Sequence, residues 1–222
     1  MIRFDGVSKR YSGGSEALKN VSFELAAGEM AFLTGHSGAG KSTLLKLLMV
    51  MERPSHGTIL VNGHNIGRLP HSQIPYYRRQ LGAVFQDHRL LTDRSVFDNI
   101  ALPLQVCGLP GSAIAQRVRA ALTAVGLAGL ESKRPLALSG GEQQRVGIAR
   151  AIVHKPRIVV ADEPTGNLDP ELSAEIMALF ARFKQAGVAV LVATHDVELI
   201  RQNPCRVLHL DHGAMVQQAA HE

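Results

Sequence analysis

The sequence predicts an α/β protein in which helices cover a mainly parallel β-sheet, with an antiparallel β flank near the N-terminus. Residues 30–34, 157–162 and 188–195 are almost continuously apolar, as strands covered on both faces are. Helical patterns separate these runs, and such alternation is typical of a doubly wound sheet. A glycine-rich segment, residues 35–42, directly follows the first run and precedes a helix rich in leucine.

Two weaker patterns indicate the other strands. Residues 21–25 alternate apolar and polar side chains, which predicts a strand with one solvated face. Asn62-Gly63 lies in a hairpin position within residues 58–66, and a short strand is expected to end at Gln86.

A mostly helical insert is predicted after Gln86. Residues 112–125 have a helical pattern, and no long strand pattern occurs between residues 87 and 135. Further helices are expected after residue 140, ending near residue 153, and over residues 170–185.

Composition narrows the function class. The chain has 222 residues and a formal charge of +5, but its basic residues are scattered, so a solvated surface is favoured over a nucleic-acid interface. The two cysteines, Cys107 and Cys205, lack the spacing of a metal site or a disulfide framework. The longest apolar run, residues 44–51, is interrupted by Lys46 and is too short to cross a bilayer. We expect a cytosolic protein or the peripheral part of a membrane complex.

The segment GHSGAGKS, here called the phosphate loop (residues 35–42), has the spacing and the strand–loop–helix context of a nucleotide site. Its backbone N–H groups would converge on phosphate oxygens at a helix N-terminus. Lys41 would reach the β- and γ-phosphates and the Ser42 hydroxyl would bind Mg²⁺. A simple glycine turn is the alternative, and we assign no chemistry to the His36 side chain. The predicted nucleotide contacts are Gly35, His36, Ser37, Gly38, Ala39, Gly40, Lys41, Ser42 and Thr43.

Two acidic residues follow the buried run at 157–162. We expect Asp162 to hold Mg²⁺ and Glu163 to orient the attacking water, with their side chains on opposite sides if the strand continues. His195 ends the next buried run, and its neutral imidazole would accept from the water and donate toward the γ-phosphate. The run HLDH, residues 209–212, suggests a metal site, but a hairpin turn is favoured.

A second glycine segment, LSGGEQQR (residues 138–145), also begins a predicted helix. Ser139 and Glu142 have the spacing of a capping box, so a structural reading exists. That reading leaves Gly140 and Gly141 unexplained, because each glycine in a helix costs about 1 kcal/mol relative to alanine. Close approach of another group would explain them. A second copy of the chain, docked head to tail, could present this segment to the outer face of the γ-phosphate.

The phosphate loop, Gln86, the second glycine segment, VVADE, GNLD and His195, in this order, resemble the nucleotide-binding subunit of ATP-binding-cassette systems. The resemblance implies one ABC ATPase domain over residues 1–222, with a RecA-like core and β flank at 1–86 and 138–222 and a helical subdomain at 87–137. It also implies ATP and Mg²⁺ as cofactors and a homodimer in which Ser139, Gly140 and Gly141 act on the partner's ATP. Tyr11 would stack on adenine, Gln86 would join Mg²⁺ and water to the insert, and Asn167, Leu168 and Asp169 would line the dimer contact. Gln143 belongs to the same expected nucleotide-binding set.

Within this family, residues 78–104 and the second glycine segment resemble the cell-division branch. This implies an integral membrane partner of the FtsX type, docked on the insert near Gln86 at the cytoplasmic face of the inner membrane, and a role in septal cell-wall hydrolysis with other division proteins. The alternative is a lipoprotein-release or macrolide-export ATPase. A nucleic-acid cassette would need tandem cassettes or a long coiled-coil insertion, and a P-loop kinase gives no use for Gly140, Gly141 or His195.

Overall fold

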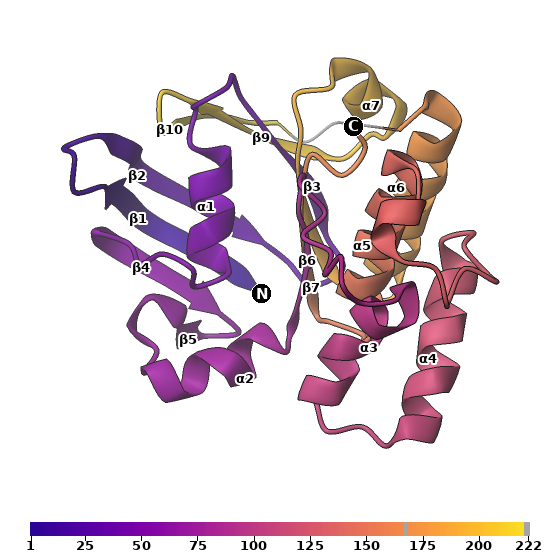
Figure 1. The fold of residues 1–222 in the computed structure, drawn as a ribbon. Helices are drawn as coiled ribbons and strands as arrows, with labels where there is room; N and C mark the ends of the chain where they lie inside the picture. The colour runs from indigo at the N-terminus through magenta and orange to yellow at the C-terminus, as the bar shows by residue number, and fades with distance from the viewer. Residues whose placement is uncertain (167, 220–222) are drawn as a thin grey trace.

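The computed structural model describes residues 1–166 and 168–219, without the side chains of residues 217–219 (Figure 1). An antiparallel four-stranded sheet has the order β2-β1-β4-β5, and a six-stranded sheet has the order β10-β9-β3-β8-β7-β6. In the first sheet the strands are β1 (Ile2–Arg10), β2 (Glu16–Leu25), β4 (His56–Val61) and β5 (His64–Asn65). The predicted antiparallel flank is confirmed.

The six-stranded sheet contains the three predicted buried strands. Strands β6, β7, β8, β3 and β9 run parallel, and β10 pairs antiparallel with β9. The strands are β3 (Met30–Thr34), β6 (Leu81–Val84), β7 (Ile158–Asp162), β8 (Ala189–Ala193), β9 (Arg206–Asp211) and β10 (Ala214–Ala219). Strand β6 ends at Val84 rather than at the expected Gln86, because the chain leaves the sheet toward the nucleotide pocket.

Helix α1 (Lys41–Leu48) lies between the two sheets (Figure 1). Its leucines at 44, 45, 47 and 48 are all buried in one core with side chains of both sheets, which explains why apolar residues surround the helix on nearly all sides. The other face of the parallel sheet is covered by α5 (Gly140–Ile152), α6 (Pro170–Gln185) and α7 (Val197–Gln202), whose buried side chains form a second core with strand residues. Helix α6 has the bounds that the sequence predicted.

The insert between β6 and α5 is helical, as predicted, with α3 (Val96–Val106) and α4 (Gly111–Ala124) packed beside α5 (Figure 1). Ser95 caps α3 by accepting from the Asp98 backbone N–H. The buried Asn99 side chain bonds both backbone groups of Leu91 and so fixes the loop that enters the insert. The short elements of the chain are η1 (Ile66–Arg68), η2 (His71–Gln73), α2 (Ile74–Arg78) and η3 (Pro135–Ala137).

Both predicted hairpins form, the first at its predicted turn and the second with its turn at the end of the predicted stretch. Asn62 and Gly63 have φ of 51° and 80°, the left-handed geometry of a two-residue turn. His212 and Gly213 have φ of 45° and 84° in the turn between β9 and β10, so the hairpin forms as predicted, although residues 209–211 still belong to β9. Among the described residues, no helix combines the length and the apolar character needed to cross a membrane.

Candidate nucleotide and catalytic site

The phosphate loop leaves β3 at the edge of the sheet where parallel strands end, and it enters α1 at Lys41. Gly35, Gly38 and Gly40 all have positive φ. A Cβ on Gly35 would lie 2.3 Å from the Leu210 carbonyl oxygen, and one on Gly40 would lie 2.5 Å from the Ala17 carbonyl oxygen. Glycine is therefore required at both positions by conformation and by close packing.

Lys41 and Ser42 lie together at the C-terminal end of this loop, where α1 begins. The Lys41 ammonium donates to the carbonyl oxygens of Gly35, at 2.6 Å, and His36, at 3.1 Å, so it lies over the loop where β- and γ-phosphates would enter. The Ser42 hydroxyl hydrogen-bonds the Asp162 carboxylate at the end of β7. The predicted phosphate and metal ligands thus come together from two strand ends.

Burial raises the pKa of the Asp162 carboxyl, and the Glu163 carboxylate raises it further. The Ser42 hydrogen bond and the ammonium groups of Lys41 and Lys46 oppose this rise. A half-buried carboxylate with incomplete charge compensation is suited to a hard cation. Ser42, Gln86 and Asp162 all offer oxygen donors, which Mg²⁺ prefers, so these residues fit the ion that the sequence implied.

Glu163 does not continue strand β7, because its φ of 48° turns the chain into the left-handed region. The condition under which Asp162 and Glu163 would point to opposite sides is therefore not met, and both residues line the same pocket. The Glu163 backbone N–H donates to the Ala193 carbonyl oxygen at 2.9 Å, which anchors this turn to the end of β8.

Glu163 and His195 form a direct pair. The His195 Nδ1 lies 2.7 Å from Glu163 Oε1, and the Thr194 hydroxyl donates to Oε2 at 3.2 Å. The Glu163 side chain is only 11% exposed, whereas that of His195 is 75% exposed. With Nδ1 facing the carboxylate as a donor, the neutral ring leaves Nε2 as its acceptor, so one nitrogen remains for the expected contact with the water and none for donation toward the γ-phosphate.

These residues line one pocket of about 540 Å³. Gln86 lines it as predicted, next to the phosphate loop and both carboxylates. Ala17 also lines it, and nothing in the sequence indicated this residue. Gly35, Ala39 and Tyr11 are not among the lining side chains, although the Tyr11 hydroxyl lies 3.4 Å from Thr43 Oγ1 at the start of α1. The lining residues are Ala17, His36, Ser37, Gly38, Gly40, Lys41, Ser42, Thr43, Gln86, Asp162, Glu163 and His195.

The second glycine segment lies apart from this pocket. The Ser139 hydroxyl accepts from the Glu142 backbone N–H, and Glu142 Oε2 accepts from the Ser139 backbone N–H at 2.8 Å, so the capping box is present. The Ser139 backbone N–H and hydroxyl both donate to Glu142 Oε2, and these hydrogen bonds hold the pKa of the Glu142 carboxyl below its ordinary value. A Cβ on the exposed Gly140 would meet no atom within 4 Å, whereas one on Gly141 would lie 3.2 Å from Leu168 Cδ2. Within the described residues of this chain, nothing requires glycine at position 140.

Two other expected contact residues, Gln143 and Asp169, lie outside the pocket as well. The Gln143 amide donates to the Leu138 carbonyl oxygen at 3.2 Å. Asp169 caps α6 by accepting from the Leu172 backbone N–H at 2.9 Å. Asn167 lies outside the described residues.

One internal link, made by the buried Gln144, was not indicated by any pattern in the sequence. Its amide nitrogen donates to the Pro164 carbonyl oxygen at 2.8 Å, and its oxygen contacts His88 Nδ1. Arg150, which follows Gln144 in the same helix α5, donates to the carbonyl oxygens of His88 and Arg89. Helix α5 therefore holds both the segment after Glu163 and the segment after Gln86.

Residues 18–166 match the ABC transporter family. The chain belongs to this family. It is 56% identical over all 222 residues, and over the full length of both chains, to the "Cell division ATP-binding protein FtsE" of Escherichia coli K12. A dimeric bacterial ABC transporter cassette shares its fold with a TM-score of 0.94 and 32% identity, covering 100% of this chain and 99% of the other. A dimeric ATP-binding cassette in a post-hydrolysis state, bound to ADP and Pi, has a TM-score of 0.94 and 31% identity over the same shares. The chain is an FtsE-like ABC ATPase that binds ATP, and its fold is that of an ABC nucleotide-binding cassette.

Proposed function

We propose that this protein is the ATP-hydrolysing subunit of a membrane complex of the FtsE–FtsX type, which acts in bacterial cell division. In this role ATP turnover would be coupled to an integral membrane partner that regulates septal cell-wall hydrolysis, with other division proteins at the septum. The chain would lie at the cytoplasmic face of the inner membrane, held there by its partner. Full-length identity of 56% to a cell-division protein is the observation that carries this proposal.

Hydrolysis would begin with the terminal phosphate held by the phosphate loop and Lys41. Glu163, shielded from solvent and held by His195 and Thr194, would orient the attacking water and accept its proton. His195 Nδ1 would donate to the Glu163 carboxylate and hold it in place, and Nε2 would then be the acceptor nitrogen of the neutral ring. Mg²⁺, held by Ser42, Gln86 and Asp162, would neutralise the developing phosphate charge.

A dimer would complete each site. Ser139, Gly140 and Gly141 lie at the exposed start of the 13-residue helix α5, where N–H groups and the helix dipole favour an anion. In one chain these groups do not line the nucleotide pocket. Two chains docked head to tail would place each helix start over the partner's γ-phosphate, and the dimeric state of two cassettes with this fold supports that arrangement.

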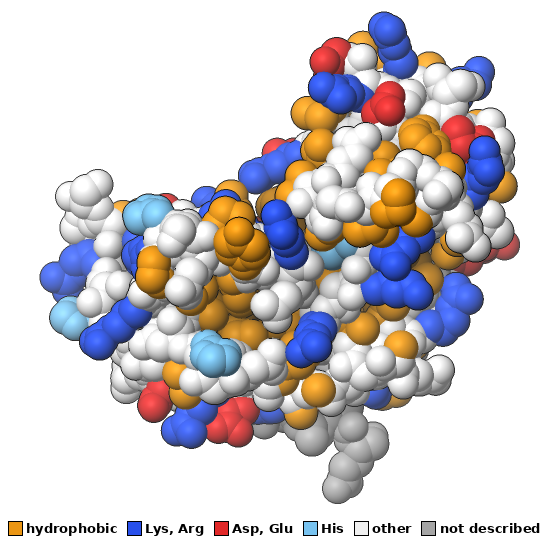
Figure 2. Space-filling view, turned by 90° about the horizontal axis from the view of Figure 1, so that it is seen from below, with side chains coloured by type: hydrophobic (Ala, Val, Ile, Leu, Met, Phe, Trp, Pro, Cys, Tyr) orange, Lys and Arg blue, Asp and Glu red, His pale blue; other side chains and the backbone are white. Residues whose placement is uncertain are grey.

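The membrane partner would dock in a groove of about 520 Å³ between the core and the helical insert. Figure 2 shows hydrophobic side chains gathered in a hollow of this face, with Lys and Arg side chains around it. Among the described residues that line it there is no carboxylate but there are four arginines, so an amphipathic segment with acidic residues would fit the groove. The groove residues are Pro75, Arg78, Arg79, Leu81, Ala83, Phe85, Arg89, Leu102, Pro103, Val106, Cys107, Arg150, Ala151 and His154.

The groove and the nucleotide pocket meet at two successive residues. Phe85 lines the groove and Gln86 lines the pocket. Arg89, which also lines the groove, stacks on the Phe85 ring at 4.2 Å and is bound through its carbonyl oxygen by Arg150 of α5. A shift of Gln86 on ATP binding or hydrolysis would therefore reach a docked segment through one short, well-anchored stretch of chain.

Val106→Asp tests this docking, because Val106 lines the groove and is 56% exposed, so the change should not disturb folding. We expect the variant to lose co-purification with FtsX from membranes while its own ATPase activity is kept. Val197→Asp, at a 64% exposed position outside the groove, is the matched control and should retain the partner.

Retention of FtsX by Val106→Asp would contradict the proposed docking surface. Recovery of a lipoprotein-releasing or drug-exporting permease in place of FtsX with the wild-type chain would favour the transport alternative.

A further inference from the structure

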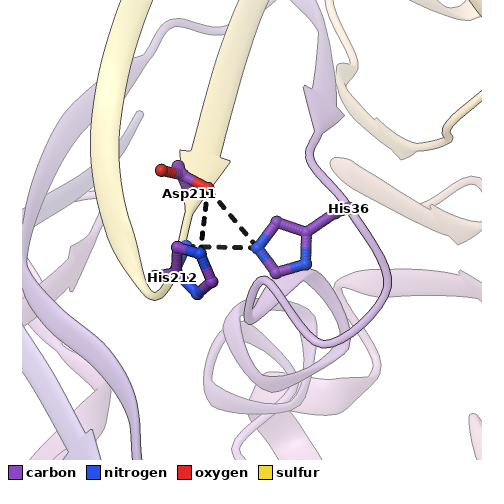
Figure 3. A group of neighbouring side chains, drawn as sticks. All are labelled: His36, Asp211 and His212. Carbon is purple, nitrogen blue, oxygen red and sulfur yellow. Dashed lines mark hydrogen bonds and ion pairs between the residues drawn. The ribbon is translucent and has the colours of Figure 1, made fainter.

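Three metal-ligating side chains outside the catalytic set converge beside the phosphate loop: His36, Asp211 and His212. Figure 3 shows the His36 imidazole, which comes from the phosphate loop, next to Asp211 and His212 of the β9–β10 turn. Sheet register brings them together, since β3 pairs in parallel with β9 and Thr34 lies opposite His209. Two residues further along each of these two segments, His36 and Asp211 become neighbours.

We propose that these three residues bind a borderline divalent transition metal, Zn²⁺ in the first place, at the mouth of the nucleotide pocket. His36 itself lines that pocket. The proposed ion is distinct from the Mg²⁺ that accompanies ATP, and its site does not depend on the cell-division role.

Distances within the cluster are close to those of a metal site. His36 Nε2 lies 3.4 Å from Asp211 Oδ1, His212 Nε2 lies 3.9 Å from the same oxygen, and one ligand atom of each residue lies within 4.8 Å of the others. Ligand atoms around a tetrahedral Zn²⁺ with bonds of about 2.0–2.1 Å are separated by roughly 3.3 Å. All three side chains are exposed. Small side-chain rotations are therefore enough to close the site.

The tautomer of the His36 ring favours ligation of a metal ion. Its Nδ1 lies 2.6 Å from the Ser37 carbonyl oxygen, so Nδ1 carries the proton and donates. The lone pair is thereby placed on Nε2, which faces Asp211 and His212. Metal-binding histidines are oriented by this kind of hydrogen bond from their second ring nitrogen. The His212 backbone N–H, 3.5 Å from Nε2, makes only a long hydrogen bond that a metal ion would replace.

The backbone under the cluster is already fixed. Gly213, next to His212, donates its N–H to the Ala39 carbonyl oxygen at 3.1 Å and accepts from the Lys19 N–H at 2.8 Å. Gly35 packs directly against the Leu210 carbonyl. The turn and the phosphate loop are therefore held together before any ion binds, which limits the conformational entropy lost on binding to that of three side chains.

Charge and donor type indicate which ion fits. Among the described residues, the two histidines are the only basic side chains within 4 Å of the Asp211 carboxylate, so no Lys or Arg competes for it. Two imidazole nitrogens and one carboxylate oxygen suit Zn²⁺, Ni²⁺ or Cu²⁺, whereas Mg²⁺ prefers oxygen ligands alone. Three protein ligands leave a fourth position for water.

The site is tested by calorimetric titration of the full chain with ZnCl₂. The purification tag is removed, and nucleotide is left out because ATP itself binds Zn²⁺. We expect the wild type to bind one Zn²⁺ per chain, with excess Mg²⁺ unable to compete. His212→Asn should weaken binding by at least about tenfold. Asparagine tolerates the left-handed φ of 45° at this position, so the turn should keep its shape.

His71→Asn is the matched control, because His71 is exposed in η2 and belongs to no metal-ligating group among the described residues, and its Zn²⁺ binding should equal that of the wild type. Asp211→Asn provides a second ligand deletion should His212→Asn fail to fold. Absence of wild-type binding at micromolar Zn²⁺, or equal affinity in the wild type and the ligand variants, would overturn the proposal.

Discussion

Replacing Gly140 with alanine should raise the stability of the chain and lower its ATPase activity. Gly140 is the first residue of α5, it is exposed, and an added Cβ would meet no atom within 4 Å. Nothing in the described part of one chain opposes the extra methyl group. If the partner's nucleotide approaches this backbone in a dimer, the methyl group would occupy the space of that approach.

The two effects have opposite signs and separable sizes. Alanine reduces the backbone entropy of the unfolded chain and favours the helix, with a gain of about 0.4–1 kcal/mol. For a chain of this size that gain raises Tm by roughly 1–4 °C. Overpacking of a close contact costs about 1–3 kcal/mol, which lowers ATP turnover roughly 5- to 160-fold if the contact forms in the transition state.

Gly111→Ala is the matched control. Gly111 is the first residue of α4, it is also exposed, and its added Cβ would likewise meet nothing within 4 Å. Differential scanning calorimetry should give a similar small rise in Tm for both variants, and phosphate release should fall only in Gly140→Ala. Wild-type turnover in Gly140→Ala would refute the reasoning that this glycine faces a second chain's nucleotide.

The catalytic residues give three further predictions. Glu163→Gln should lower phosphate release by about 10²- to 10⁴-fold and should accumulate ATP-bound dimers in size-exclusion chromatography. Glu175→Gln, on the exposed face of α6, is the control and should keep wild-type turnover. A Glu163→Gln chain that stays monomeric with ATP would count against the mechanism. Lys41→Ala should weaken ATP binding itself in calorimetry, and unchanged affinity would remove Lys41 from the phosphate site. Burial raises the pKa of Asp162 in the folded state, so ionisation of this carboxyl opposes folding. Asp162→Asn should therefore raise the Tm of the nucleotide-free chain at neutral pH, and the gain in Tm should shrink as acid protonates the wild-type carboxyl. A gain in Tm that is independent of pH would contradict this assignment.

The sequence was a good guide wherever a local pattern determines the structure. Apolar runs located the parallel strands β3, β7 and β8, since strands covered on both faces cannot alternate polar and apolar side chains. The glycines of the phosphate loop were read correctly, because positive φ and close approach leave few other residues possible.

The sequence did not indicate two kinds of feature: a residue that departs from the backbone conformation usual for its type, and contacts between residues far apart in the sequence. Glutamate rarely adopts a left-handed φ, so nothing in the sequence indicated that the chain turns at Glu163, although both carboxylates were expected in one site. The contact of His195 Nδ1 with Glu163 depends on that turn. The link through Gln144 and the convergence of His36 with the β9–β10 turn depend on tertiary packing and sheet register, which a single sequence does not specify.

A mixing experiment tests most directly whether the nucleotide site is shared between chains. Chains carrying Ser139→Arg keep an intact phosphate loop, and chains carrying Lys41→Ala keep an intact second glycine segment, so each variant alone should be inactive. In an equal mixture half of the dimers are heterodimers with one complete site of two, which predicts recovery of about a quarter of wild-type phosphate release. A mixture no more active than its separate components would mean that each chain's Ser139 serves no nucleotide but its own, or none.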